Sequence, residues 1–274
     1  MDRRNFLLLA SLSPLFWRAG IAIADSVNSF DSALAGLNID DIINAKKYIE
    51  PEVRRIFRVE TQGAHAATRS KLTISQSALD LIIAFEVSSE KVYRKKLIHP
   101  IWPGGASGPT FGIGYDAGYA SASSVTDTWG NLLDKDTVTQ LSSGAGKTGR
   151  VAQEYVSTVQ HLVIEWEPAL AQFTDFLPFV IAQAETSFQN LDKLSPDSRG
   201  ALVSLVYNRG SDASLKKRRE EMYYISQHMA SMEFDKIPAE IEKMKKLWPG
   251  KDQRGLLLRR DLEAQLFRAG LASS

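Results

Sequence analysis

The stretch PIWPGGASGPTFGIGYDAGY, residues 100–119, interrupts a sequence whose pattern is otherwise mostly helical. It contains six glycines and three prolines, the two residue types that most often end helices and form turns. Within it Phe111, Ile113 and Tyr115 alternate with glycines, an alternation typical of a strand. The stretch therefore predicts a small region of β structure in a helical protein.

The polar residues of this stretch fall on one face of the predicted strand. Thr110 and Asp116 share that face, and Gly112 and Gly114 between them carry no side chain. Such a face leaves room for a ligand against the backbone, although a glycine-rich hairpin with a purely structural role has the same pattern. Six residues of straight strand span roughly 20 Å, so Thr110 and Asp116 can act on one ligand only if the strand bends at its glycines.

A strong helical pattern runs from Leu72 to Tyr93, just before the glycine-rich stretch. Leu79 and Ile82 lie on its apolar face, and Glu86 continues the same row one turn further on. Burial at the end of an apolar face disfavours the charged form of a carboxyl group, which is what a general acid requires. If the helix instead frays at Phe85, Glu86 only reaches water.

From Leu132 almost to the end of the sequence the pattern is helical. Glycine and proline predict breaks between these helices, at 144–149, Pro168, 195–196, 209–210 and 249–255. We therefore predict an α+β fold that is mostly helical, with a small β-containing lobe inserted between a first helix and a larger helical lobe.

Four segments resemble, in the same order, the successive signatures of phage-type lysozymes, and most closely those of the pesticin-like muramidase branch. They are FEVSSEKVY (85–93), the glycine-rich stretch (100–119), GALVSLVYNRG (200–210) and GLLLRRDLEAQLF (255–267). The similarity spans about Ile74 to Phe267, and the four segments together are far more specific than any one of them. The resemblance implies a lysozyme-like fold with a cleft between its lobes. It also implies an enzyme that hydrolyses the β-1,4 bond between N-acetylmuramic acid and N-acetylglucosamine in the glycan strand of peptidoglycan.

The resemblance implies three catalytic residues. Glu86 matches the acid that ends the first helix, Thr110 the threonine that helps hold the attacking water, and Asp116 the aspartate that activates this water or stabilises the transition state. Phage lysozymes place their catalytic aspartate before the glycine strand, whereas this chain has no aspartate between Glu86 and Thr110. That departure favours the pesticin-like branch, for which the resemblance implies inversion at the anomeric carbon.

Two later segments supply supporting residues by the same resemblance. Asn208 and Arg209, followed by Gly210, end a helix that lines the far wall of the cleft in the family. Arg259 and Arg260 match an arginine pair, one member of which approaches the catalytic glutamate. The alternative for this pair is a position on the surface.

Two aromatic residues of the glycine-rich stretch, Trp102 and Tyr115, complete the candidates for substrate contact. Trp102 stands beside Pro103, where an indole ring either stacks on a sugar or fills the space beneath the loop. The aromatic residues alone do not decide between a binding role and a packing role.

Two other functions are compatible with these residues. A lytic transglycosylase uses one glutamate as acid and then as base, needs no second carboxylate, and leaves 1,6-anhydro ends on its products. A cell-wall-binding protein that has kept the fold and lost catalysis is the other alternative, and the presence of both Glu86 and Thr110 argues against it.

Composition and charge exclude several classes of protein. The 274 residues carry a formal net charge of +1, which argues against a nucleic-acid binder, because such proteins need a basic face to displace counterions from phosphates. Cysteine is absent, so there is no disulfide, thiolate metal site or cysteine nucleophile. The histidines show no metal-ligand spacing, and we predict neither a metal nor an organic cofactor. The sequence identifies no immunity or inhibitor partner.

The first 24 residues resemble a cleavable export signal. Arg3 and Arg4 precede an apolar run at 6–16, and Ala22 to Ala24 form a cleavage site of small residues. The paired arginines are similar to those of a twin-arginine signal, and the alternative is a Sec signal with a basic start. The run is shorter than the ~20 residues that span a bilayer, so we expect no membrane anchor after cleavage.

The chain is thus predicted to have three parts: an export signal at 1–24, an N-terminal extension at 25–70 and a lysozyme-like muramidase domain at 71–274. Without residues 1–24, which hold three arginines and one aspartate, the chain has 30 basic and 31 acidic residues. We expect the mature protein in the periplasm or outside the cell.

Overall fold

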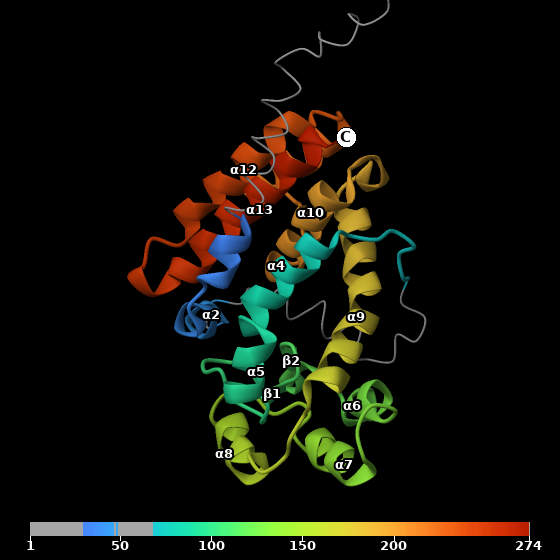
Figure 1. Ribbon diagram of the computed structural model, residues 1–274, viewed down its shortest axis with the longest axis vertical. Helices are drawn as coiled ribbons and strands as arrows, with labels where there is room; N and C mark the ends of the chain where they lie inside the picture. The colour runs from blue at the N-terminus through green and yellow to red at the C-terminus, as the bar shows by residue number, and fades with distance from the viewer. Residues whose placement is uncertain (1–29, 47, 49–67, 274) are drawn as a thin grey trace, which may run out of the picture.

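The computed structural model describes residues 30–46, 48 and 68–273, which form a mostly helical molecule with one two-stranded sheet among these residues (Figure 1). The predicted export signal, residues 1–24, lies outside the described residues, as does most of the predicted extension at 25–70. Within the described residues, no helix combines the length and the hydropathy that a membrane span requires.

Two helices, not one, fill the region from Leu72 to Tyr93. Helix α4 (Gln76–Val87) begins where the Ser75 hydroxyl accepts a hydrogen bond from the Ala78 amide, and α5 (Glu90–Lys96) begins at Ser89. The prediction of one continuous helix is wrong because Ser88 adopts φ 69° and Ser89 caps the next helix. The alternative that this helix frays at Phe85 is also wrong, since α4 continues to Val87.

The glycine-rich stretch folds into a hairpin instead of one strand. Strand β1 (Thr110–Phe111) pairs antiparallel with β2 (Tyr115–Asp116), and Thr110 lies opposite Asp116. The chain turns between the strands at Gly112 and Gly114, whose φ angles of 58° and 81° suit glycine. The bend that the sequence required is therefore a full reversal, which brings Thr110 and Asp116 side by side.

Aromatic rings form the core beneath this hairpin. The ring of Phe111 lies 5.3 Å from that of Tyr115 and 5.3 Å from that of Trp129, and Tyr115 meets Trp129 edge-on at 5.6 Å. A Cβ atom on Gly112 would stand 2.7 Å from the Trp129 ring, so this glycine lets the hairpin lie directly on the indole. The alternation of apolar residues seen in the sequence thus buries one face of the hairpin.

Short helices accompany the hairpin and complete what we call the small lobe, the group of elements from β1 to α8 at the lower end of Figure 1. They are η1 (Ala117–Tyr119), α6 (Ala122–Trp129), α7 (Lys135–Ser143) and α8 (Gly149–Val159). The break predicted at 144–149 is confirmed between α7 and α8.

A long helix, α9 (Trp166–Ser187), runs from the small lobe along the helical body (Figure 1). The sequence predicts a break at Pro168, and this is wrong, because Pro168 lies in the first turn of α9. There its missing N–H group removes no helical hydrogen bond.

The helical body comprises the remaining elements of the C-terminal half. They are η2 (Leu191–Lys193), α10 (Pro196–Arg209), α11 (Glu220–Ala230), η3 (Phe234–Lys236), α12 (Ile237–Lys243), η4 (Met244–Leu247), η5 (Lys251–Gln253) and α13 (Arg254–Ala272). Helix α10 is its central element and packs against α4, α9 and α13. The breaks predicted before Pro196 and after Arg209 are confirmed.

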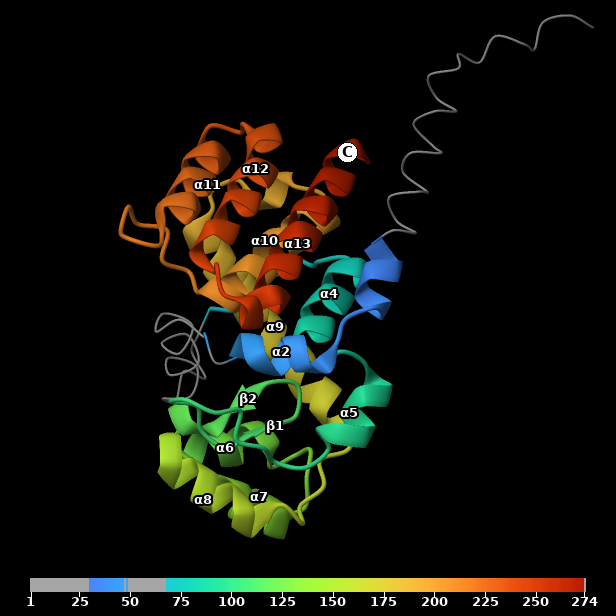
Figure 2. The ribbon, with the colours of Figure 1, turned by 90° about the vertical axis from the view of Figure 1, so that its left-hand side faces the viewer.

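Part of the predicted N-terminal extension belongs to this same body. Helix α2 (Ile39–Lys46) packs on α4 and α13 and places Ile42 in the core (Figure 2). A Cβ atom on Gly255 would lie 2.5 Å from the Asp41 carbonyl oxygen, so the two helices touch at their backbones. The start of α13 is therefore held by a segment from the other end of the chain.

Candidate active site

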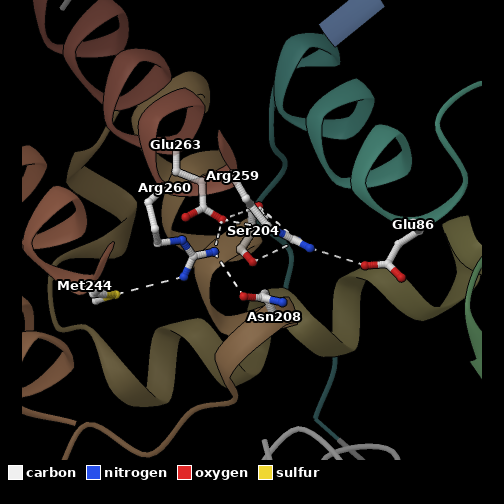
Figure 3. Close-up of polar contacts among 7 residues, drawn as sticks. All are labelled: Glu86, Ser204, Asn208, Met244, Arg259, Arg260 and Glu263. Carbon is white, nitrogen blue, oxygen red and sulfur yellow. Dashed lines mark hydrogen bonds and ion pairs between the residues drawn. The ribbon is translucent and has the colours of Figure 1, made fainter. Parts of the chain in front are cut away.

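Glu86 lies in the last turn of α4, where the helical body meets the hairpin. Its side chain is 13% exposed, and its Oε1 atom stands 3.3 Å from Nη1 of Arg259 on α13 (Figure 3). The apolar row that leads to Glu86 is buried at Ile82, as the spacing predicted. The carboxyl group is thus mostly buried but keeps contact with solvent.

The second oxygen of Glu86 faces the hairpin. A Cβ atom on Gly114 would lie 2.8 Å from Glu86 Oε2 and 3.6 Å from the hydroxyl oxygen of Tyr207. The carboxyl group can approach the hairpin this closely only because residue 114 has no side chain. Glu86 is therefore held between an arginine on one side and bare backbone on the other.

Asp116 fixes the base of the hairpin. Its Oδ1 atom accepts hydrogen bonds from the amides of Gly108 and Gly118, each at 2.9 Å. The backbones of these two glycines are in direct contact, since a Cβ atom on Gly108 would lie 2.2 Å from the Gly118 Cα. Asp116 has a structural role whether or not it also takes part in chemistry.

Thr110 is buried opposite Asp116, and its hydroxyl donates to the Gly108 carbonyl at 3.2 Å. The structure thus brings Thr110 and Asp116 together on one hairpin, with the Gly114 end of that hairpin against Glu86. The three predicted catalytic residues belong to one region of the fold.

The arginine pair is buried, so the alternative of a surface pair is wrong. Arg259 is the member that approaches Glu86, and it also donates to Ser204 and to Glu263 (Figure 3). Arg260 points the other way, with Nη2 2.9 Å from Glu263 Oε1 and 3.1 Å from the Asn208 side-chain oxygen. The two arginines share one buried carboxylate.

Asn208 and Arg209 occupy different environments. Asn208 is half-buried and joins the arginine network through Arg260. Arg209 is completely buried, lies 5.1 Å from the Trp248 ring and donates to the Arg218 carbonyl. A buried Arg209 contributes to packing at the end of α10 and has no surface with which to line a cleft.

The two aromatic candidates of the glycine-rich stretch have different environments, and of the two Tyr115 has a packing role. Tyr115 is buried in the core of the small lobe and offers its ring to Phe111 and Trp129, not to a ligand. Trp102 is half-buried, and its indole N–H donates to the Ser107 carbonyl at 3.0 Å. That bond ties Trp102 to its own loop.

Sequence reasoning missed Glu263 and Tyr207. Glu263 lies four residues after Arg259 and three after Arg260, a spacing that places all three side chains on neighbouring positions of a helix and was a usable signal. Tyr207 carries no such signal, because its approach to Gly114 joins residues that are far apart in the sequence.

Within the described residues, no group of three or more His, Asp or Glu side chains is placed to hold a metal ion. Neither the models of known protein families nor the curated proteins gave a match to this sequence. The interpretation of the site therefore depends on its geometry and on the resemblance of its four motifs.

Proposed function

We propose that this protein is a peptidoglycan muramidase in which Glu86 protonates the leaving oxygen of the β-1,4 bond after N-acetylmuramic acid. The observation that carries the proposal is the carboxyl group of Glu86, 13% exposed and held between Arg259 and Gly114 where the hairpin meets the helical body. A fixed, largely desolvated carboxyl group with access to solvent fits a general acid in glycoside hydrolysis.

In the same proposal the hairpin supplies the second half of the reaction. The Thr110 hydroxyl donates a hydrogen bond to the Gly108 carbonyl, so its oxygen is the atom that would accept a hydrogen bond from the attacking water. The Asp116 carboxylate, whose Oδ1 accepts from two backbone amides, would take the proton of that water. The outcome would be inversion, as in hydrolases that place a water between two carboxyl groups.

A lytic transglycosylase is the second candidate, and one observation favours it. The Asp116 carboxylate already has a structural task, because it binds the amides of Gly108 and Gly118. If this is its whole role, Glu86 acts alone, first as acid and then as base. The products then carry 1,6-anhydro ends instead of reducing ends.

The proposal places the mature protein outside the cytoplasm, where its substrate is. Residues 1–24 carry the arginine pair and the apolar run of an export signal, which would direct the chain out of the cytoplasm. N-terminal sequencing of protein recovered from the periplasm or medium should give Asp25 as the first residue.

The test is digestion of purified sacculi followed by mass spectrometry of the products. Wild-type protein should release fragments with reducing ends, and Glu86→Gln, which cannot donate a proton, should lose a factor of about 10²–10⁴ or more in rate while remaining folded. Glu90→Gln is a matched control, because Glu90 is an exposed carboxylate on α5 paired with Arg94.

Three results would change the proposal. Anhydro ends in place of reducing ends would assign the transglycosylase reaction. Glu86→Gln with undiminished cleavage would remove Glu86 from the mechanism. A folded wild-type protein that binds sacculi and releases nothing would identify a wall-binding protein without catalysis.

A further inference from the structure

We propose that Glu263 is a positioning residue that keeps Glu86 competent as an acid by binding both arginines of α13, so that Arg259 reaches Glu86 through Nη1. This inference rests on the proposed function and deepens it. Glu263 is fully buried and does not contact Glu86, so it acts through Arg259 (Figure 3).

One oxygen of Glu263 gathers three donors. Its Oε1 atom accepts from the Ser204 hydroxyl at 2.7 Å, from Arg260 Nη2 at 2.9 Å and from Arg259 Nε at 3.2 Å. Every one of these side chains is buried, so the contacts are little screened by water. The shared carboxylate fixes both guanidinium groups on the same face of α13.

The position of Arg259 limits what Glu86 receives from it. Its Nε atom is directed at Ser204 and Glu263, and its Nη2 atom donates to the Ser204 carbonyl and hydroxyl at 3.1 Å. Nη1 then reaches Glu86 at 3.3 Å, which is longer than the 2.7–2.9 Å typical of a charge-assisted hydrogen bond. This single long contact from Arg259 orients the carboxyl group more weakly than a bidentate pair would.

Charge balance leads to the same conclusion. Glu86 and Glu263 together match Arg259 and Arg260. If Glu263 lost its charge, Glu86 would be the carboxylate that balances two buried arginines, and its ionised form would be favoured. A general acid that is ionised at the working pH cannot donate its proton.

The charged groups on the neighbouring elements do not replace Glu263 in this role. From α10 the hydroxyl of Tyr207 approaches the same glycine as Glu86. Asp41 of α2 is paired with Arg254, and Glu90 of α5 is paired with Arg94. Among the described residues, Glu263 is the carboxylate bound to the arginine that also contacts Glu86.

The first experiment is the pH profile of peptidoglycan cleavage by Glu263→Gln. Glutamine keeps the size of the side chain and an oxygen that accepts from Ser204 and the arginines, and it replaces the other oxygen by an uncharged NH2 group. Loss of a nearby negative charge lets Glu86 ionise at lower pH. The alkaline limb of the profile should therefore move down by about one pH unit, with roughly tenfold less activity at neutral pH that recovers at lower pH.

The second variant should shift the alkaline limb of the pH profile in the opposite direction. Arg260→Gln removes a positive charge and leaves Glu263 in place, so the alkaline limb should move to higher pH. The double variant Arg260→Gln with Glu263→Gln restores the charge balance, and its limb should return toward that of the wild type. A merely structural Glu263 would lower activity equally at every pH, without moving the limb in either direction.

A titration of the Glu86 carboxyl group by NMR, assigned with Glu86→Gln, measures the same quantity without any turnover. The midpoint should fall in Glu263→Gln and rise in Arg260→Gln. An unchanged midpoint in whichever of these variants folds would overturn the inference. Failure of the wild-type protein to cleave peptidoglycan would instead remove the proposed function, and the titration would still decide whether Glu263 controls the charge of Glu86.

Discussion

The two sides of Glu86 are constructed in different ways. On the α13 side its Oε1 atom meets a side chain, Arg259, which is held by other buried side chains through charge and hydrogen bonds. On the hairpin side its Oε2 atom meets the backbone at Gly114, where no side chain fits. The position of Oε1 therefore depends on buried charged side chains, and the position of Oε2 depends on the absence of a side chain at residue 114.

Each side also has its own anchoring carboxylate. Glu263 binds side-chain donors of α10 and α13, whereas Asp116 binds the backbone amides of Gly108 and Gly118. Removal of a charged partner from the α13 side should therefore cost much stability, and changes on the hairpin side should alter activity more than stability. Three substitutions test that contrast.

Arg259→Ala should give the largest loss of stability. It removes one of the three buried donors to Glu263 and the side-chain donor to the Ser204 carbonyl, and removal of one partner of a buried ion pair costs about 3–5 kcal/mol. Turnover should fall as well, because Arg259 orients the Glu86 carboxyl group. The structure leads us to expect both losses, because Arg259 also joins α13 to α10.

Urea unfolding and cleavage assays on the same preparation measure both effects. Arg254→Ala is the control, since Arg254 is an exposed arginine at the start of α13 and pairs with Asp41, and it should lose less than about 1 kcal/mol. If Arg259→Ala lost as little stability as Arg254→Ala, the contrast between the α13 side and the hairpin side of Glu86 would be removed.

Gly114→Ala should have an intermediate effect on stability and a large one on activity. Alanine at φ 81° costs about 1–2 kcal/mol of stability. Its methyl carbon would lie 2.8 Å from Glu86 Oε2, which is too close, so the Glu86 carboxyl group would have to move. A misplaced acid should reduce cleavage by about 100-fold. Gly105→Ala is the control that separates backbone strain from displacement of Glu86. Gly105 has φ 60° and no atom within 4 Å of an added Cβ, so its alanine variant has the strain alone. Equal activity of the two variants in the cleavage assay would show that Gly114 does not position Glu86.

Asp116→Asn should change stability least, by less than about 1 kcal/mol, because asparagine keeps an oxygen for the amides of Gly108 and Gly118. Activity should still fall by at least about 100-fold if Asp116 activates the water. Thermal unfolding together with product analysis gives both quantities. A stable variant that still cleaves would limit Asp116 to its structural role and favour the transglycosylase.

Local rules in the sequence predicted the parts of this fold that depend on neighbouring residues. The breaks at Pro196 and after Arg209 follow from proline and glycine, and Glu86 continues the buried face of its helix. The break at Ser88 was missed because serine at positive φ is uncommon, although Ser89 is a recognisable helix cap.

The parts that depend on distant contacts were less accessible. The sequence predicts one strand where the structure has a hairpin, because alternation of apolar residues does not reveal where a chain reverses and the glycines allow either shape. The burial of Arg209 beneath Trp248 and the contact of Tyr207 with the hairpin join segments that are separate in sequence. No local pattern encodes such contacts.

The separation between Glu86 and its partner has a consequence for the order in which this protein is made. These two residues are 173 positions apart, and Asp41 and Arg254 are 213 apart. During synthesis the hairpin and Glu86 leave the ribosome long before Arg259 and Glu263 exist, and contacts between such distant segments form late in folding. A chain interrupted anywhere before α13 carries the acid without the groups that orient it, so the site can assemble only after α13 has been synthesised.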